Sequence, residues 1–278
     1  MGELSARLDH LQLLSDAPER LAAFYGEALG MTPQRLGEDL WLCAASERRV
    51  LIGRGPSRTL GFGAYRFDSQ PGLAAMRKRL EAHGITPGAS RSPLFGPHAF
   101  SLADPDGNII IFGHSVRSAP GAREARRARL QHVAVASDNP ERLLRFYAEV
   151  LGFVLSDKVV EDGALSACWL RTDREHHTMA VFRTRRPGRR LDHHSFEVTD
   201  WALIRDWADD LAAHGIGLVW GPGRHGPGNN LFILIRDPDD NLIEFSAELE
   251  VITDDRPARV WPQAESTFNK WGSASLRT

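Results

Sequence analysis

The sequence predicts an α+β protein of two domains, each built from two βαβββ modules that form a half-open mixed-sheet cavity. Two observations support this prediction. Residues 8–31 and 130–153 are offset by 122 positions and share 13 of 24 residues, so the chain contains an internal repeat. Within each half, a second strand-then-helix pattern follows, at 60–85 and at 191–216. The chain is therefore expected to contain four modules.

Each copy of the longer repeat predicts a strand, a helix and a turn. A short apolar or alternating run precedes Ser-Asp-x-Pro-Glu-Arg, and a helical pattern of apolar residues follows. Serine and aspartate favour the N-cap and proline favours the first turn. The candidate N-caps are Ser15 or Asp16 in the first copy and Ser137 or Asp138 in the second. We expect these helices to end at Gly30 and Gly152.

Each half is expected to close with a hairpin, at 103–112 and at 236–245. Asp-Pro-Asp-Gly and Asp-Pro-Asp-Asp are strong turn signals between apolar runs. A polar stretch rich in arginine and alanine lies between the two halves and is typical of a linker. The predicted divisions are an N-terminal domain at 1–114, a linker at 115–129, a C-terminal domain at 130–250 and a tail at 251–278.

Composition indicates a globular protein. Of 278 residues, 25% are charged and 42% are hydrophobic, and the net charge of −2 gives no reason to expect nucleic acid or a membrane as partner. Basic clusters at 123–129 and 183–190 are interpreted as a solvated linker or loop. Cys43 and Cys168 provide neither a disulfide framework nor a thiolate metal site. Without a signal peptide or a long apolar run, we expect the cytoplasm.

Strand phase separates candidate ligands from core residues in the second half, because alternate side chains of a strand share one face. The residues expected to pack into the core are Val133, Val135, His194, Phe196, Val198, Ile243 and Phe245. This assignment leaves His132, His193 and Glu244 on the opposite faces, with small neighbours beside both histidines. We infer that these faces line the half-open cavity.

Two imidazoles and one carboxylate are the ligand set of non-haem Fe(II) oxygenases. Taken singly, a strand histidine is more often a core or surface residue, and an inward glutamate often pairs with an arginine. Three such residues at equivalent, inward positions of a repeat instead predict a metal site at His132, His193 and Glu244. Fe(II) is the expected ion, and Mn(II) shares the same ligand preference.

The first half provides an internal control for this prediction. His10 corresponds to His132, but Phe62 occupies the position of His193 and Ile111 that of Glu244. One ligand cannot hold a metal ion, so His10 is interpreted as a structural residue. The first domain is expected to be a scaffold and the second to carry the chemistry.

The C-terminal half resembles the type I extradiol (meta-cleaving) catechol dioxygenases of the vicinal oxygen chelate, or glyoxalase-like, superfamily. The matching segments are HVAVASDNPERLLRFYAEVLGF, EHHTMAV, LDHHSFEVTD, GPGRHGPGNN and RDPDDNLIEF, all between 132 and 245. The two-domain plan fits as well, so the resemblance spans nearly the whole chain. It implies the vicinal oxygen chelate fold, an aromatic diol and O2 as substrates, and a homo-oligomer.

The resemblance also assigns roles to single residues. His132, His193 and Glu244 match the family's metal ligands, His177 its acid–base histidine and His225 its second-sphere histidine. A histidine suits proton transfer because its ordinary pKa lies near neutrality. The implied reaction removes protons from a vicinal diol, adds O2 and opens the ring with a proton returned by His177. His176 is expected at a turn, pointing away from His177.

Two positions depart from the family pattern. Leu234 stands where these enzymes usually carry a tyrosine that hydrogen-bonds the diol, and Ala134 replaces a polar residue found in some relatives. Tyr25, Tyr65 and Tyr147 offer no obvious substitute. The pocket therefore accepts an unusual diol, or the metal serves other chemistry.

Two alternative functions stay open at this point. The first is a metal-dependent lyase, isomerase or epimerase of the same superfamily, although such enzymes typically use four protein ligands. The second is a non-catalytic small-molecule binding (resistance) protein, which has no reason to keep three metal-binding residues. Trp169, Phe182 and Trp220 could form pocket wall or core. The tail, which contains Trp261 and Trp271, could cover the pocket or mediate assembly.

Overall fold

A computed structural model describes residues 4–114, 127–185 and 190–274. Most of the predicted linker and part of the second basic cluster lie outside these residues. No helix in the described part of the chain is long and apolar enough to cross a bilayer.

The first half contains two βαβββ modules in one sheet. The first module consists of β1 (Ala6–Ser15), α1 (Pro18–Glu27), β2 (Thr32–Arg35), β3 (Leu40–Ala44) and β4 (Arg49–Arg54). The second consists of β5 (Thr59–Phe67), α2 (Gln70–Ala82), β6 (Gly88–Ala89), β7 (Phe100–Ala103) and β8 (Ile109–Gly113). Their strands form an eight-stranded sheet in the order β2-β3-β4-β1-β5-β8-β7-β6. The modules therefore meet where β1 pairs with β5.

The second half repeats this plan. Its third module consists of β9 (Arg129–Ser137), α3 (Pro140–Arg145) continued by the π-helical turn η1 (Phe146–Leu151), β10 (Val154–Glu161), β11 (Ala164–Arg171) and β12 (Met179–Arg183). The fourth consists of β13 (Arg190–Val198), α4 (Trp201–Ala213), β14 (Trp220–Arg224), β15 (Leu231–Arg236) and β16 (Leu242–Ala247). The sheet order is β14-β15-β16-β13-β9-β12-β11-β10-β17. The predicted α+β fold of four βαβββ modules is confirmed.

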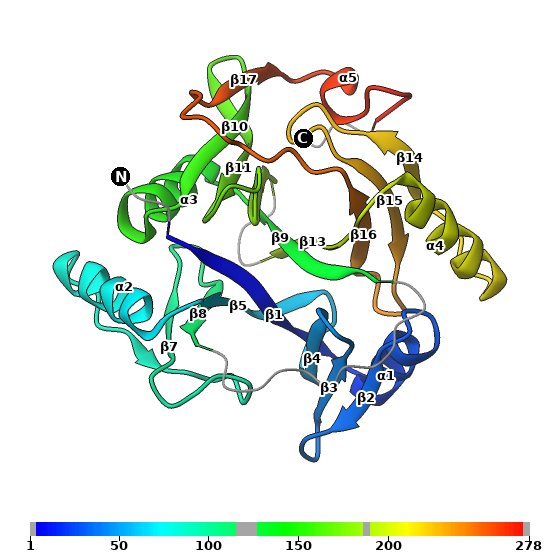
Figure 1. The fold of residues 1–278 in the computed structure, drawn as a ribbon, viewed down its shortest axis with the longest axis horizontal. Helices are drawn as coiled ribbons and strands as arrows, with labels where there is room; N and C mark the ends of the chain where they lie inside the picture. The colour runs from blue at the N-terminus through cyan, green and yellow to red at the C-terminus, as the bar shows by residue number, and fades with distance from the viewer. Residues whose placement is uncertain (1–3, 115–126, 186–189, 275–278) are drawn as a thin grey trace.

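The tail folds back onto this second sheet. It supplies β17 (Arg259–Pro262), which pairs in parallel with β10, and the short helix α5 (Glu265–Phe268). Figure 1 shows β17 and α5 crossing the open end of the second sheet, from β10 toward β14. The tail therefore covers the cavity side of this half.

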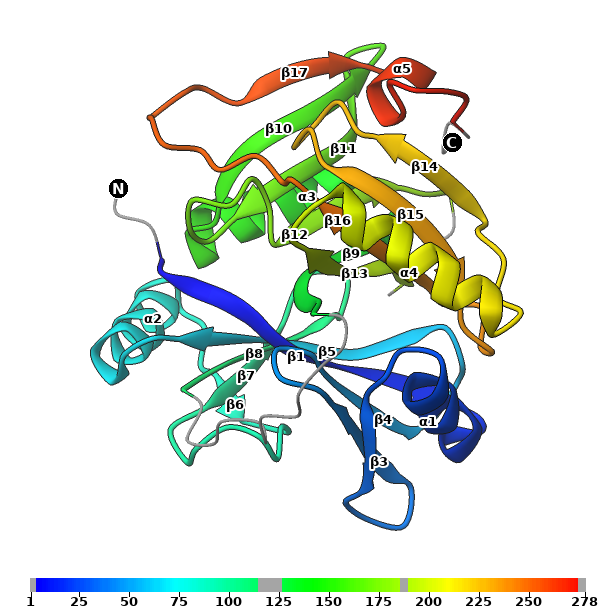
Figure 2. The ribbon, with the colours of Figure 1, turned by 45° about the vertical axis from the view of Figure 1, so that its right-hand side comes forward.

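One hydrophobic core joins the two halves. Figures 1 and 2 show the halves stacked, with α2 and α3 on one side of the molecule and α1 and α4 on the other. The core contains residues from both sheets and from the four helices α1, α2, α3 and α4. Two buried tyrosines cross the boundary, because Tyr25 lies 3.1 Å from His194 Nε2 and Tyr147 donates to Asp104 Oδ2 at 3.2 Å. The halves thus stabilise each other through their helix-covered faces.

The predicted helix N-caps were wrong by one or two residues. The N-caps are Ala17, whose side chain makes no cap, and Asn139, whose Oδ1 accepts from Arg142 N at 3.0 Å. Ser15 and Ser137 instead end their strands, and each hydroxyl accepts from the backbone N–H two residues later. The helices begin late because the proline takes the first helical position.

The expected helix ends fit better. Gly152 is the left-handed C-cap of η1, with φ at 82°, and Gly30, at φ 61°, follows two residues after the C-cap of α1.

The last predicted linker residue, Arg129, belongs to β9 instead. Its guanidinium forms ion pairs with Glu175 and Glu197, so a charged residue is accommodated at the start of an inner strand. The polar composition that favoured a linker therefore extends into the sheet.

Candidate metal centre and its pocket

The three predicted ligands lie on adjacent strands of the second sheet. Strand β13 lies between β9, with which it pairs antiparallel, and β16, with which it pairs parallel. In this register Ser195 of β13 lies opposite His132 on one side and opposite Glu244 on the other. His193 is two residues along from Ser195 on the same face. The sheet therefore brings His132, His193 and Glu244 together from segments more than 50 residues apart in sequence, as strand phase predicted.

The ligand atoms of this triad converge on one buried point. His132 Nε2 is 3.0 Å from His193 Nε2, and the Glu244 carboxylate lies 4.0 Å from His132 and 3.7 Å from His193. One ligand atom of each residue lies within 4.8 Å of the others. All three residues are at most 5% exposed. This is the arrangement of a 2-His-1-carboxylate centre.

Hydrogen bonds at the far side of each ring fix which nitrogen faces the centre. His132 Nδ1 lies 2.5 Å from Gln131 Oε1, and Gln131 Nε2 donates to the His177 carbonyl, so the amide oxygen must accept. His193 Nδ1 lies 2.5 Å from the Asp192 carboxylate. Both Nδ1 atoms therefore carry the proton, and both Nε2 lone pairs face the centre.

This donor set fits a divalent cation. Two lone pairs and a carboxylate that converge in a buried site repel one another unless positive charge lies between them. Burial lowers the pKa of His132 to about 3, which keeps its imidazole neutral. Burial alone would raise the pKa of Glu244, but a hydrogen bond with His225 and the neighbouring imidazoles lower it to about 2. At neutral pH His132 is therefore neutral and Glu244 is ionised, which are the protonation states that metal binding needs.

The triad opens into a cavity. Its lining residues are His132, Trp169, His177, Phe182, His193, Trp220, His225, Pro227, Leu234, Glu244, Thr267 and Phe268. The sequence left open whether three aromatic residues form pocket wall or core. All three line the cavity: Trp169, Phe182 and Trp220. Thr267 and Phe268 come from the tail, so the expectation that the tail could cover the pocket is confirmed. Among these described lining residues, Glu244 is the single carboxylate and no lysine or arginine occurs.

The two predicted acid–base histidines both line the cavity. The His177 ring centroid is 4.4 Å from that of His132, and burial, followed by the neighbouring histidines, lowers the pKa of His177 well below its ordinary value. His225 Nε2 lies 3.6 Å from Glu244 Oε2. Its Nδ1 lies 2.5 Å from the Phe268 carbonyl, so Nδ1 carries a proton, and its ring stacks on Phe232. The structure thus brings both residues to the candidate centre.

The expectation for His176 was partly wrong. The residue does lie in the bend between β11 and β12, but it is fully buried, and its Nδ1 is 3.0 Å from His177 Nδ1. The alternation used to point it away from His177 applies to strands, and β12 begins only at Met179. His176 is therefore a neighbour of the site.

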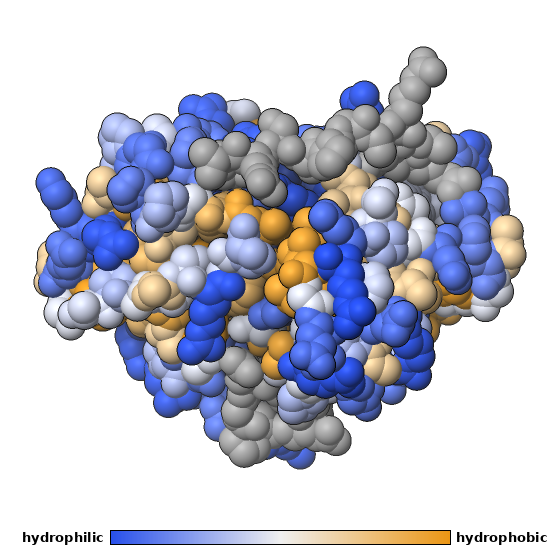
Figure 3. Space-filling view, turned by 90° about the horizontal axis from the view of Figure 1, so that it is seen from below, coloured by the Kyte–Doolittle hydropathy of each residue, from blue (hydrophilic) through white to orange (hydrophobic). Residues whose placement is uncertain are grey.

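The first half has the same frame without the ligands. Phe62 pairs with Gln12, and His193 pairs with the equivalent residue of the second half, Ala134, so Phe62 occupies the position of His193. Ile111 pairs with Ala64, and Glu244 pairs with the equivalent residue Ser195, so Ile111 occupies the position of Glu244. The predicted correspondences are therefore confirmed by register. Phe62 and Ile111 belong to a separate apolar cluster. Figure 3, which views the first-half side, shows apolar atoms gathered in the middle of a hydrophilic rim.

His10 is held by protein groups on both ring nitrogens. Its Nδ1 is 2.7 Å from Asp9 Oδ1, and its Nε2 is 2.6 Å from Ser92 Oγ. Phe95 packs against the ring, with centroids 4.7 Å apart. The nitrogen that would face a metal is therefore already paired, as expected for a structural residue.

Leu234 lies in the wall of the cavity, opposite Glu244 in the β15–β16 register. Tyr25, Tyr65 and Tyr147 all lie in the shared core. None of them replaces the tyrosine that the family places at this position.

Sequence reasoning missed the groups that orient the ligands. Gln131 and Asp192 each precede a candidate metal-ligand histidine and accept from its Nδ1. Asp9 does the same for His10. A polar acceptor before each inward histidine was a readable signal, because a ligand histidine commonly donates its other ring N–H to such a group.

Comparisons with known proteins agree with this geometry. Residues 129–245 match the model of the Glyoxalase/Bleomycin resistance protein/Dioxygenase superfamily. Metapyrocatechase 2 of Cupriavidus necator is 27% identical, over 95% of this chain and 88% of its own. The Mn(II)-bound glyoxalase from Novosphingobium aromaticivorans superposes with a TM-score of 0.81 at 24% identity, covering 99% and 92% of the two chains.

A substrate complex of homoprotocatechuate 2,3-dioxygenase from Brevibacterium fuscum superposes with a TM-score of 0.84 at 22% identity, covering 97% and 89%. At these identities the two structural matches establish the fold. Residues 129–245 thus match the Glyoxalase/Bleomycin resistance protein/Dioxygenase superfamily, and the curated relatives support a resemblance of the chain to the extradiol catechol dioxygenases.

Proposed function

We propose that this protein is an extradiol ring-cleaving dioxygenase that adds O2 to a catechol-type aromatic diol. The observation that carries the proposal is the buried group of His132, His193 and Glu244 at the base of an apolar-walled cavity. We propose Fe(II) as the ion these residues hold, with Mn(II) as the alternative. When bound, the metal would supply positive charge and open positions for the two diol oxygens and O2.

The chain's own residues supply orientation and proton transfer. Gln131 and Asp192 hold the ligand rings in place through Nδ1. His177 lies beside His132 with its ring in the cavity wall, where a neutral imidazole can take a proton from a diol hydroxyl and return it during ring opening. His225, held by the Phe268 carbonyl, lies close to Glu244 and is the second group placed to contact substrate.

A glyoxalase-type lyase or isomerase is the alternative, since one structural neighbour is a glyoxalase. Such an activity typically needs a fourth protein ligand and a carboxylate base. Among the described residues of the cavity wall, Glu244 is the single carboxylate. The geometry therefore favours the dioxygenase, and three retained ligands also disfavour a purely binding protein.

The cavity wall also predicts which diol is preferred. Because its described residues include no lysine or arginine, a substrate carboxylate would lose its hydration without gaining a partner. We therefore expect catechol and 2,3-dihydroxybiphenyl to be cleaved with a kcat/KM at least about tenfold above that of 3,4-dihydroxyphenylacetate, since about 1.4 kcal/mol of unpaired burial is enough for this ratio.

Anaerobic reconstitution tests the proposal. The protein is loaded with Fe(II) or with Mn(II), mixed with each diol and exposed to air, while O2 uptake and a yellow ring-opened product are measured. We expect O2 to be consumed in an amount equal to that of the ring-opened product, and turnover to be higher with one of the two metals. Stoichiometric metal binding without O2 uptake across the diol panel would contradict the dioxygenase and favour the lyase or isomerase.

The domain division at 1–114, 115–129, 130–250 and 251–278 is retained as a proposal, with Arg129 moved to the C-terminal domain, and the homo-oligomeric state is proposed as well. Light scattering on the eluting protein gives the oligomeric state directly. A single-chain mass under all conditions would contradict the proposed assembly.

A further inference from the structure

A buried aspartate lies behind the acid–base histidine, on the side away from the cavity. Asp157 Oδ2 is 3.2 Å from His176 Nε2, and His176 Nδ1 is 3.0 Å from His177 Nδ1. Asp157 and His176 are both fully buried, and His177 is 3% exposed. The Nε2–H of His176 does not point straight at the carboxylate, but attraction at this distance does not require alignment. The three residues form a chain that ends in the cavity.

The charge of Asp157 decides where the protons lie in this chain. Burial alone would raise the pKa of this carboxyl, but His176, Trp261 and Arg256 lower it below its ordinary value. An ionised carboxylate only accepts, so His176 carries its proton on Nε2. With the proton of its imidazole on Nε2, His176 accepts at Nδ1 from His177 Nδ1–H, across 3.0 Å. This tautomer leaves His177 Nε2 as a lone pair, which is the form able to take a proton from a bound diol.

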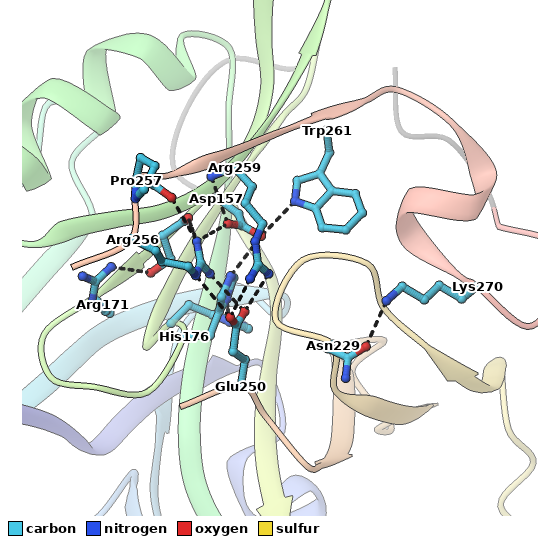
Figure 4. Close-up of polar contacts among 12 residues, drawn as sticks. Asp157, Arg171, His176, Asn229, Glu250, Arg256, Pro257, Arg259, Trp261 and Lys270 are labelled. Atoms are coloured by element: carbon cyan, nitrogen blue, oxygen red, sulfur yellow. Dashed lines mark hydrogen bonds and ion pairs between the residues drawn. The ribbon is translucent and has the colours of Figure 1, made fainter. Parts of the chain in front are cut away.

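The tail holds Asp157 in this position, as Figure 4 shows. The Trp261 indole N–H donates to Asp157 Oδ2 at 2.8 Å, and Arg256 lies 3.1 Å from Oδ1. Both Arg256 and Arg259 also bind the Glu250 carboxylate. The Glu250 carbonyl in turn accepts from the His176 backbone N–H at 2.9 Å. Carboxylate, imidazole and tail therefore form one connected group.

We propose that Asp157 and His176 are positioning residues that hold His177 in the tautomer with Nε2 unprotonated, and that the C-terminal tail maintains them through Trp261 and Arg256. This inference deepens the proposed dioxygenase function and rests on the role given there to His177. It gives the tail a part in catalysis besides covering the cavity.

The first test needs neither metal nor turnover. Metal-free protein labelled with ¹⁵N-histidine is compared by NMR with its Asp157→Asn variant, after thermal unfolding shows that the variant is folded. We expect His177 to be mainly the Nδ1–H tautomer in the unchanged protein. In Asp157→Asn the amide can donate to His176, so a substantial Nε2–H population of His177 should appear. An unchanged His177 tautomer in the folded variant would overturn the proposal.

Kinetics of the loaded enzyme provide the second test. For Asp157→Asn we expect kcat to fall about 10- to 100-fold, as for other groups that orient a functional histidine, while KM changes less than about threefold. Asp157→Glu keeps the charge and should recover most of kcat. A fall in metal stoichiometry that accounts for the whole loss of kcat would contradict the assigned role.

The tail provides a milder variant in case Asp157→Asn does not fold. Trp261→Phe removes one N–H donor and keeps an aromatic ring, so we expect a two- to fivefold loss of kcat, consistent with one hydrogen bond, and a smaller tautomer shift in the same direction. Trp271→Phe is the matched control, because that tail side chain is 54% exposed and should change neither readout. Equal effects of the two variants would overturn the role of the tail. Should the protein cleave no diol, the tautomer measurement still decides this proposal.

Discussion

The two halves of this protein use one frame for opposite purposes. At the same register positions, the second half places His193 and Glu244, and the first half places Phe62 and Ile111. The first set converges lone pairs and a carboxylate on a buried point, and the second closes the corresponding space with an apolar cluster. The fold alone therefore does not determine the chemistry, because two residues per half decide it.

His10 and His132 occupy equivalent positions in the two halves, and their hydrogen bonds differ in a way that follows from the presence or absence of the other two candidate ligands. His10 and His132 both direct Nδ1 at the side chain of the preceding residue. In the second half Nε2 faces the other ligands, whereas in the first half Ser92 Oγ lies 2.6 Å from Nε2. The first half is thus internally satisfied, and the second half directs its facing lone pairs at the proposed cation.

The largest expected effect is on metal binding. His193→Ala should reduce bound Fe(II) to less than about a tenth of one ion per chain and ring cleavage by at least about 10³-fold, because two ligands do not replace a facial triad. Metal content by mass spectrometry and O2 uptake provide the measurements. His10→Ala is the matched control and should keep full stoichiometry. Metal retained in His193→Ala, or lost in His10→Ala, would reverse the assignment of the two halves.

The second prediction concerns stability, and here the larger effect is expected from the substitution in the first half. Phe62 is 2% exposed within an apolar cluster, so Phe62→Ala should lower the free energy of unfolding by about 3–5 kcal/mol. In metal-free protein, His193→Ala should cost less than about 1 kcal/mol, because it also removes the repulsion of two facing lone pairs. Urea unfolding of both variants without metal gives the difference. A larger loss in His193→Ala would show that the second site is satisfied without a cation.

The sequence predicted those parts of this contrast that depend on the alternation of side chains along a strand and on the internal repeat. Strand phase distinguished His193 from His194, and the repeat aligned Phe62 and Ile111 with the ligands, because both depend on backbone geometry that a sequence pattern reflects. His176 and Asp157 could not be placed this way. His176 lies in a bend, and Asp157, which contacts it directly, lies on a strand that pairs with a tail strand distant in sequence. Contacts between distant irregular segments leave no periodic signal.

A third prediction tests whether acid sensitivity also differs between the halves. Burial lowers the pKa of His194 to about 3, and its counterpart in the first half by register is Gly63. In the unfolded chain this histidine takes up a proton below pH 6.5, whereas in the folded protein it does so only near pH 3. Its contribution to stability is therefore complete above pH 6.5 and is lost as the pH falls, by about 2 kcal/mol at pH 5.

Unfolding of metal-free protein between pH 7 and pH 5 measures this loss. His194→Gln should remove about 2 kcal/mol of the pH dependence, and His98→Gln, at an exposed loop position, should leave it unchanged. An unaltered pH dependence in His194→Gln would place the acid sensitivity elsewhere.

The smallest expected effect tests the position where the chain departs from its relatives. Leu234 lines the cavity opposite Glu244, and in the first half Ser101 lies opposite Ile111 in the same register. Leu234→Tyr would bring a hydroxyl to the diol side of the centre. A single added hydrogen bond is worth about 0.5–1.5 kcal/mol, so we expect the KM for catechol to fall about two- to tenfold.

Two controls separate the hydroxyl from the added bulk. Leu234→Phe adds the ring alone and should not lower the KM for catechol, while both variants should raise the KM for the larger 2,3-dihydroxybiphenyl by occupying part of the cavity. Ser101→Tyr places the same side chain in the half without ligands and should leave both values unchanged. If Leu234→Phe lowers the KM for catechol as much as Leu234→Tyr does, the wall acts by shape, and the missing family hydroxyl has no part in this pocket.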